Sequence, residues 1–123
     1  MIKEIAFVAY PANDVGALIP FYRDTLGLNL TSTYDEENKA QYAEFNVGQN
    51  GWFGLMNKDW VDRPAGSGVG VAFEVDDIEA TVAELRGKGI TVADVYPTPV
   101  CKVTSFEDPE GNKVTLHQST LPH

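Results

Sequence analysis

Hydrophobic and polar positions follow a pattern that occurs twice along the chain. An apolar, β-rich run at 5–10 is followed by a polar break and a helix-like stretch that starts after Asp14. A second apolar run at 69–75 is followed by the same sequence of features, with the helix-like stretch starting after Asp77. When the two segments are superimposed, Asp14 falls on Asp77. The pattern therefore predicts an internal duplication.

The helix-like stretches have recognisable boundaries. Asp77 is a favourable N-cap residue, and Ile78, Val82 and Leu85 share one face at spacings of four and three. The first stretch has a similar apolar stripe, but Pro20 lies inside it. Proline removes a backbone donor and clashes with the preceding turn, so we expect it to kink this helix or to confine regular helix to one side.

Three strand candidates follow each helix. They cover 28–34, 40–47 and 51–56 in the first copy and 90–96, 101–107 and 112–118 in the second. Each copy thus reads β-α-β-β-β, with module one at about 1–57, a polar, Pro/Gly-rich linker at about 58–67, and module two at about 68–118. One such unit leaves a sheet face uncovered, so we expect two units to bring their sheets together and enclose a cavity.

The stretch EDPEGNK is the clearest turn signal. Its Asp-Pro-Glu-Gly core suits a type I turn with Gly111 in the left-handed region, closing a hairpin. If Asp108 pairs with Asn112, Val103 faces His117. Cys101 is then the diagonal neighbour of His117 on the same face of the sheet.

Charge and composition narrow the possible partners. Eighteen acidic residues stand against nine basic ones, which gives a net charge of -9 and disfavours nucleic acid and anionic membranes. No apolar run approaches the roughly 20 residues of a membrane span, and the first residues lack a cleavable signal pattern, so a cytoplasmic location is expected by default. A single cysteine, Cys101, allows no intrachain disulfide.

Three stretches together resemble the vicinal oxygen chelate superfamily, also described as the glyoxalase/bleomycin resistance/dioxygenase family. They are FVAYPANDVGALIPFYRDTLGL, GVAFEVDDIEATVAELRGKGI and FEDPEGNKVTLHQ, and they occur in the expected order over nearly the whole chain. The resemblance implies an α+β fold of paired βαβββ modules, with a curved mixed sheet around a cavity, and a homodimer. It leaves the reaction open, because the family includes isomerases, lyases, dioxygenases, transferases and drug binders.

Metal-dependent members of that family hold the ion with four side chains, one on each of four equivalent strands. Those places correspond here to Phe7, Gly54, Gly70 and Thr115. Phenylalanine and glycine offer no side-chain donor, and a threonine hydroxyl is a weak ligand for the usual transition metals. We therefore expect no metal and no cofactor at this place. A site rebuilt from Glu74 and His117 remains an alternative.

Two side chains near that place can carry chemistry. His117 follows Thr115 by two residues and so points to the same face. It can serve as an acid, a base or a hydrogen-bond donor to a substrate, or it can be a half-solvated residue near a strand end. Cys101 can be a nucleophile beside it, or a small buried hydrophobic residue. Glu74 shares a face with Gly70 and can also point into the cavity.

Aromatic residues dominate the rest of the expected cavity. Phe7, Trp52, Gly54 and Met56 are expected to face it, and aromatic walls with few polar groups suit a flat or apolar small molecule. The two glycines are expected to leave space at its floor. Alternatively, Phe7 and Trp52 fill the cavity or belong to a dimer interface. Trp60 in the linker is either a lid or a packed loop residue.

The leading interpretation is a metal-independent protein of this family that binds or sequesters a small, partly aromatic or apolar molecule, as bleomycin-resistance proteins do. A glyoxalase-type lyase or isomerase, or a dioxygenase-related enzyme with a non-standard site, is the alternative. A structural or regulatory module with a collapsed cavity is a third possibility.

Overall fold

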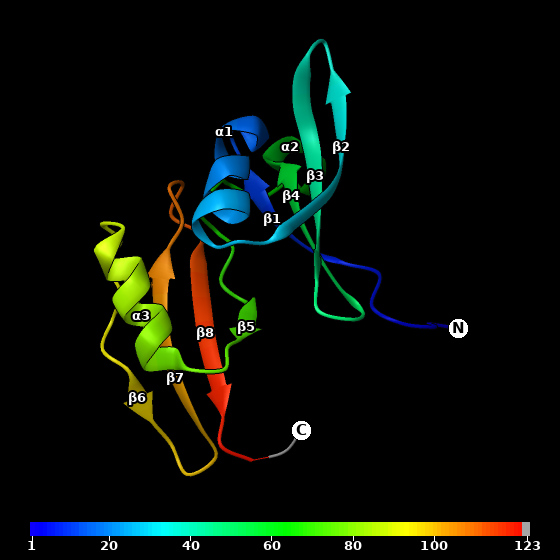
Figure 1. Ribbon diagram of the computed structural model, residues 1–123. Helices are drawn as coiled ribbons and strands as arrows, with labels where there is room; N and C mark the ends of the chain where they lie inside the picture. The colour runs from blue at the N-terminus through cyan, green and yellow to red at the C-terminus, as the bar shows by residue number, and fades with distance from the viewer. Residues whose placement is uncertain (122–123) are drawn as a thin grey trace.

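The computed structural model describes residues 1–121 and contains two four-stranded mixed sheets (Figure 1). The first half of the chain forms β1 (Val8–Ala12), α1 (Val15–Pro20), η1 (Phe21–Thr25), β2 (Asn29–Glu36), β3 (Lys39–Val47), β4 (Gly51–Asn57) and α2 (Lys58–Val61). The second half forms β5 (Ala72–Glu74), α3 (Ile78–Gly87), β6 (Tyr96–Pro97), β7 (Cys101–Glu107) and β8 (Lys113–Ser119). No helix in the described part is long and apolar enough to cross a membrane.

The two sheets repeat one topology. Their strand orders are β1-β4-β3-β2 and β5-β8-β7-β6, so corresponding strands occupy corresponding places. In each sheet the first strand is parallel to the last one, and the remaining pairs are antiparallel. The predicted fold class, α+β with paired βαβββ modules, is therefore confirmed.

Equivalent aspartates start the two main helices. The Asp14 carboxylate accepts a hydrogen bond from the Ala17 amide at 3.1 Å, and Asp77 accepts one from the Ala80 amide at 3.0 Å. Each bond satisfies an amide that has no partner inside its helix. The superposition of Asp14 on Asp77 in the sequence is thus reproduced in the geometry of both caps.

Pro20 ends the regular part of the first helix. The chain continues as the π-helix η1, in which the Leu26 amide bonds to the carbonyl of Phe21 at 3.0 Å. Pro20 has no amide hydrogen to continue the α-helical ladder, as expected from the sequence. The change of helix type leaves Leu18 and Tyr22 buried in the core.

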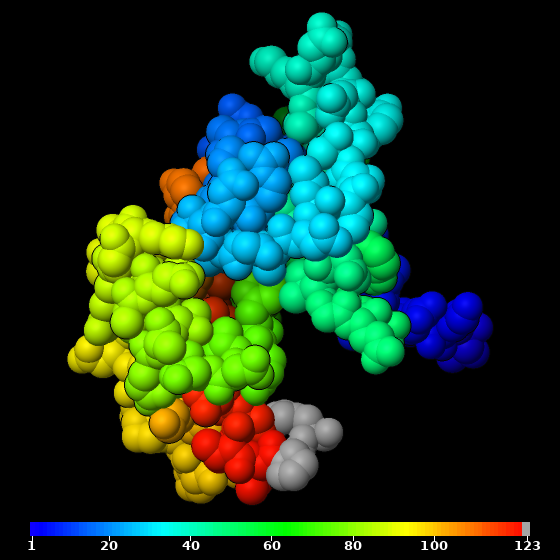
Figure 2. Space-filling model, in the orientation of Figure 1, coloured from blue at the N-terminus to red at the C-terminus, as the bar shows by residue number. Residues whose placement is uncertain are grey.

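Two expectations about element boundaries were wrong. The first strand starts at Val8, not at residue 5, and Figures 1 and 2 show the N-terminal segment running away from the body. The predicted linker at about 58–67 contains the short helix α2, and its bounds stay a prediction. The strand expected at 90–96 is reduced to Tyr96–Pro97. The Thr104 hydroxyl donates a hydrogen bond to the Ala93 carbonyl at 2.5 Å. A side chain thus bonds to this carbonyl in place of a backbone amide from a neighbouring strand.

The predicted hairpin register is confirmed. Val103 pairs with His117 and Cys101 with Ser119 across β7 and β8. The turn between these strands has Gly111 at a φ of 89°, a conformation that side-chain-bearing residues rarely adopt. The Asp108 carboxylate closes the turn by accepting the amide hydrogens of Glu110 and Asn112, each at 2.9 Å.

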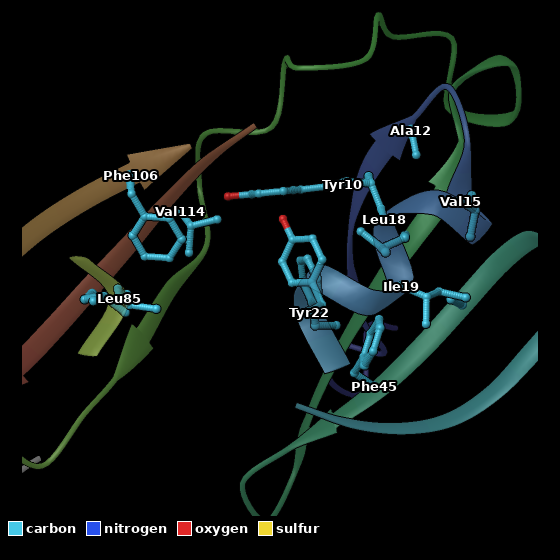
Figure 3. Close-up of a cluster of buried hydrophobic side chains, with 14 of the residues drawn as sticks. Tyr10, Ala12, Val15, Leu18, Ile19, Tyr22, Phe45, Leu85, Phe106 and Val114 are labelled. Atoms are coloured by element: carbon cyan, nitrogen blue, oxygen red, sulfur yellow. The ribbon is translucent and has the colours of Figure 1, made fainter. Parts of the chain in front are cut away.

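Two tyrosines join the halves of the molecule inside the core. Figure 3 shows Tyr10 and Tyr22 with their hydroxyls directed toward the strands that carry Phe106 and Val114. The Tyr10 hydroxyl donates to the Lys113 carbonyl at 2.8 Å and accepts from the Val71 amide at 2.7 Å. Packing around both rings is apolar, so these bonds fix the two halves against each other.

Candidate functional site

A shallow, wide-open depression of 530 Å³ lies on the first sheet, and we call it the aromatic hollow. Its walls are Phe7, Tyr34, Glu36, Tyr42, Glu44, Met56 and Trp60. Side chains alternate between faces along a strand, and Ala43, Phe45 and Leu55 on the other face are fully buried in the core. The hollow therefore opens on the face of the sheet that the core leaves uncovered.

The rings of the hollow are arranged in two pairs. The centroids of Phe7 and Tyr42 are 5.8 Å apart in an edge-to-face contact, and those of Tyr34 and Trp60 are 5.9 Å apart. Phe7, Tyr34 and Trp60 each keep between 43% and 52% of their surface exposed. Neighbouring large rings at this exposure leave apolar surface in water, which is typical of a ligand or partner site.

Gly54 allows Tyr42 to lie across the floor of the hollow. A Cβ at position 54 would come within 2.7 Å of Tyr42 Cε1, so only glycine accommodates this ring position. The expected empty space at Gly54 is therefore wrong, because the phenol fills it. The Tyr42 hydroxyl donates to Glu44 Oε2 at 2.7 Å. Burial and this carboxylate raise the pKa of Tyr42, so the hydroxyl remains a donor at neutral pH.

Two of the predicted cavity residues line the hollow, Phe7 and Met56. Trp52 lies near the other end of β4, opposite Asn46, and is not one of its walls. Sequence reasoning did not single out Tyr34 or Tyr42 as walls. Alternation along β2 and β3 was the signal that could have found them, because Tyr34 faces Tyr42 across the two strands.

The second group of predicted residues lies on the other sheet. Thr115 pairs with Ala72, and His117 pairs with Glu74, so both pairs follow the expected face. His117 Nδ1 lies 2.5 Å from Glu74 Oε1, and Glu74 Oε2 accepts the Ser119 amide hydrogen at 2.7 Å. These contacts fix the carboxylate beside the imidazole. A Cβ at Gly70 would meet no atom within 4 Å, and Gly70 is exposed, so its place in the floor of a cavity stays a prediction.

The two groups do not line one hollow within a single chain. All walls of the aromatic hollow come from the first half of the sequence, whereas Gly70, Glu74, Thr115 and His117 belong to the second. Figure 1 shows the two sheets side by side, each with its own helix, rather than closed on each other. The two groups therefore lie on different sheets of the single chain.

Cys101 contacts Thr98, whereas a nucleophile–base pair would require it to contact His117. The residue is buried, and its sulfur lies 3.1 Å from the Thr98 hydroxyl. Register places it diagonally across from His117, as expected, but the imidazole contacts Glu74. A catalytic role for Cys101 and His117 thus stays a prediction.

The residues at the family's metal places do not fit a metal ion. Phe7 presents a ring, Gly54 lies beneath a phenol, and Thr115 offers only a hydroxyl. Within residues 1–121, no group of three or more histidine, cysteine, aspartate or glutamate side chains could hold one. Glu74 and His117 supply two donors, fewer than the usual three or four protein ligands of zinc.

Comparison with known proteins identifies the family. The model of the Glyoxalase/Bleomycin resistance protein/Dioxygenase superfamily matches residues 4–116. Searching curated proteins gave no match. The antibiotic-binding protein TnmS3 from Streptomyces sp. CB03234 is similar in structure, with a TM-score of 0.83, 25% identity, and 97% of this chain and 98% of that chain covered.

Two further solved structures are similar. A glyoxalase/bleomycin resistance protein from Streptomyces sp. CB03234 has a TM-score of 0.79 at 26% identity, covering 94% of this chain and 100% of that one. Lactoylglutathione lyase from Agrobacterium tumefaciens has a TM-score of 0.79 at 22% identity, covering 95% of this chain and 94% of that one. This likeness shows a shared fold. Because the family model matches residues 4–116, which is most of the chain, the chain belongs to the Glyoxalase/Bleomycin resistance protein/Dioxygenase superfamily.

Proposed function

We propose that this protein binds a small, partly aromatic or apolar molecule in the aromatic hollow, without a metal ion, and so sequesters it. The observation that carries the proposal is the set of exposed rings around one shallow depression, Phe7, Tyr34 and Trp60 above all. A similar protein, TnmS3, is described as antibiotic-binding, which favours binding over catalysis. The single-cysteine, acidic composition fits a cytoplasmic location, which is part of the proposal.

Ring contacts supply the affinity in this proposal. Covering an aromatic side chain removes apolar surface from water at about 25 cal/mol per Å², and stacking adds about 0.5–1.5 kcal/mol per favourable pair. The Tyr42 hydroxyl and Glu44 supply the polar contacts that orient the ligand. Part of this gain is offset by the ordering of ligand and side chains.

A second copy of the chain completes the site in this proposal. The hollow is open on one side, and on the other sheet the side chains of Glu74 and His117 are 55% and 25% exposed. Further apolar side chains are exposed on the N-terminal segment, namely Ile2 at 93% and Ile5 at 80%. Both observations favour a homodimer whose second copy covers the ligand. Sedimentation equilibrium tests this, and a monomer at tens of micromolar would contradict it.

Thermal-shift screening of chelator-treated protein tests ligand binding. A library rich in aromatic compounds and antibiotics should contain members that raise the melting temperature, because a ligand of the native state stabilises it. The double variant Tyr34→Ser/Trp60→Ser should lose these shifts. Tyr96→Ser, which removes an exposed ring from the other sheet, is the control. The proposal fails if no compound stabilises the protein, or if its ligands stabilise the double variant equally.

A glyoxalase-type lyase or isomerase is the second candidate, and the contact between Glu74 and His117 favours it. A carboxylate beside Nδ1 orients an imidazole for acid/base work. In this reading His117 moves the proton and Cys101 lies close by. Any activity found should then fall about a hundredfold or more in His117→Ala. Unchanged turnover in both His117→Ala and Cys101→Ala would exclude the metal-free enzyme.

A further inference from the structure

We propose that the aromatic hollow selects organic cations, in which a compact ammonium group is attached to an aromatic or apolar body. This inference rests on the proposed binding function and narrows its ligand class. It combines two features of the same surface, namely exposed ring faces and carboxylates. Neither feature alone would distinguish a cationic ligand from a neutral one.

Charge in the hollow has one sign. Glu36 and Glu44 are two of its seven walls, and among the described residues that line it none is lysine, arginine or histidine. The whole chain carries a net charge of -9, so the field around the hollow is negative as well. Such a surface attracts cations during encounter and repels phosphates and carboxylates.

The bond between Tyr42 and Glu44 holds a carboxylate in place. The Tyr42 hydroxyl donates to Glu44 Oε2 at 2.7 Å, and burial raises the pKa of that hydroxyl, so it remains a neutral donor at neutral pH. A positioned carboxylate pairs with an ammonium at lower entropic cost than a mobile one. Glu44 is therefore the principal anionic contact for the ligand's cationic group.

The rings provide a second attraction for the same group. A cation over the face of tryptophan or tyrosine interacts favourably with the ring quadrupole, most strongly with tryptophan. Trp60 and Tyr34 lie together at one side of the hollow, and Tyr42 lies on its floor. The apolar part of the ligand then contacts Phe7 and Met56, whose side chains cannot pair with charge.

Three probes of similar shape separate the contribution of ligand charge from that of apolar contact. Naphthalenemethylamine, naphthalenemethanol and naphthoate, substituted at the same ring position, are a cation, a neutral molecule and an anion at neutral pH. Calorimetric titration of each into the full chain at low salt should give an amine affinity about tenfold above that of the alcohol, with the anion weakest. Raising the salt concentration should weaken the binding of the amine and leave the affinity for the alcohol unchanged.

Matched variants assign the effect to the hollow. Glu44→Gln retains an acceptor for the Tyr42 hydroxyl and should lower the amine affinity severalfold, as should Glu36→Gln. Asp35→Asn changes the net charge equally, lies beside Glu36 in β2 and is not a wall of the hollow, so it should change the amine affinity much less than Glu44→Gln does. Unchanged alcohol binding shows that each variant keeps the hollow intact.

The outcomes separate this inference from the function on which it rests. Equal binding of amine and alcohol, or an Asp35→Asn effect as large as that of Glu44→Gln, would overturn cation selection and leave small-molecule binding standing. Tightest binding of the naphthoate would also overturn it. Failure of all three probes to bind would count against both proposals.

Discussion

The hydroxyl of Tyr22 donates a hydrogen bond to the carboxylate of Asp108 across the boundary between the two halves, with 2.7 Å between the oxygens. Tyr22 is fully buried, and Asp108 keeps 4% of its surface exposed. The same carboxylate also accepts the Asn112 side-chain amide at 2.8 Å. Because every partner is buried, this contact links the turn between β7 and β8 to the helix η1 that covers the first sheet.

Removing the Tyr22 hydroxyl should destabilise the fold. Tyr22→Phe leaves the buried Asp108 carboxylate with one donor fewer, and we expect the free energy of unfolding to fall by about 1–3 kcal/mol. Urea denaturation measures this. Tyr34→Phe removes a hydroxyl from a half-exposed ring and should change stability by less than about 0.5 kcal/mol. Equal stability of the two variants would contradict a structural role for the bond.

Stability should decline in alkaline solution. Burial, and then Asp108, raise the pKa of Tyr22, and burial also raises that of Tyr10. A raised folded-state pKa keeps the proton bound in the native state after unfolded tyrosine, with a pKa of about 10, has lost it. The contribution is therefore complete below about pH 10 and is lost as the pH rises above that value, by up to about 1.4 kcal/mol per pH unit for each tyrosine.

Urea denaturation between pH 8 and pH 11, values chosen to bracket the unfolded pKa of about 10, checks this slope. The free energy of unfolding should decline less in Tyr22→Phe than in the wild type, because one of the buried tyrosines with a raised pKa is gone. A stability that rises through this range, or an identical decline in the variant, would contradict the assignment to Tyr22.

A methyl group at Gly54 should disturb the hollow. Its carbon would meet the Tyr42 ring at 2.7 Å, so the phenol that bonds to Glu44 must move. The affected atoms are at the far end of a flexible side chain, and we therefore expect the fold to survive. Affinity for an aromatic probe should fall about tenfold in Gly54→Ala.

Gly70→Ala is the matched control for that change. A Cβ there meets nothing within 4 Å, and Gly70 is not a wall of the hollow. Calorimetric titration of naphthalenemethylamine into both variants compares them directly. Equal affinities in the two alanine variants would show that Tyr42 does not shape the binding surface.

Local features of the sequence were sufficient for much of the fold. The cap at Asp77 and the turn at Gly111 depend on residues within a few positions of each other, so their geometry could be predicted together with the β7–β8 register. The strand expected at 90–96 forms only in part. The reason lies in another element, where the hydroxyl of Thr104 in β7 donates a hydrogen bond to the Ala93 carbonyl. No periodicity in the segment itself signals that contact.

The candidate site was harder to predict, for the same reason. Its apolar members Phe7 and Met56 follow from strand alternation and from the family's pattern. The contact between Tyr34 and Trp60 requires the linker to form α2 and its Trp60 ring to reach Tyr34 of β2, which is a tertiary event. The filling of the Gly54 space by Tyr42 also joins residues of two strands, and inspecting either strand alone cannot reveal it.

The most direct test of ligand binding in the aromatic hollow uses the two methionines of the chain. Met56 is a wall of the hollow, whereas Met1 is fully exposed outside it. With methyl-labelled, chelator-treated protein, titration of naphthalenemethylamine should shift the Met56 methyl resonance, leave that of Met1 in place, and lose the effect in Tyr34→Ser/Trp60→Ser. A Met56 resonance that stays fixed while the ligand binds, or binding that requires an added metal ion, would contradict the account.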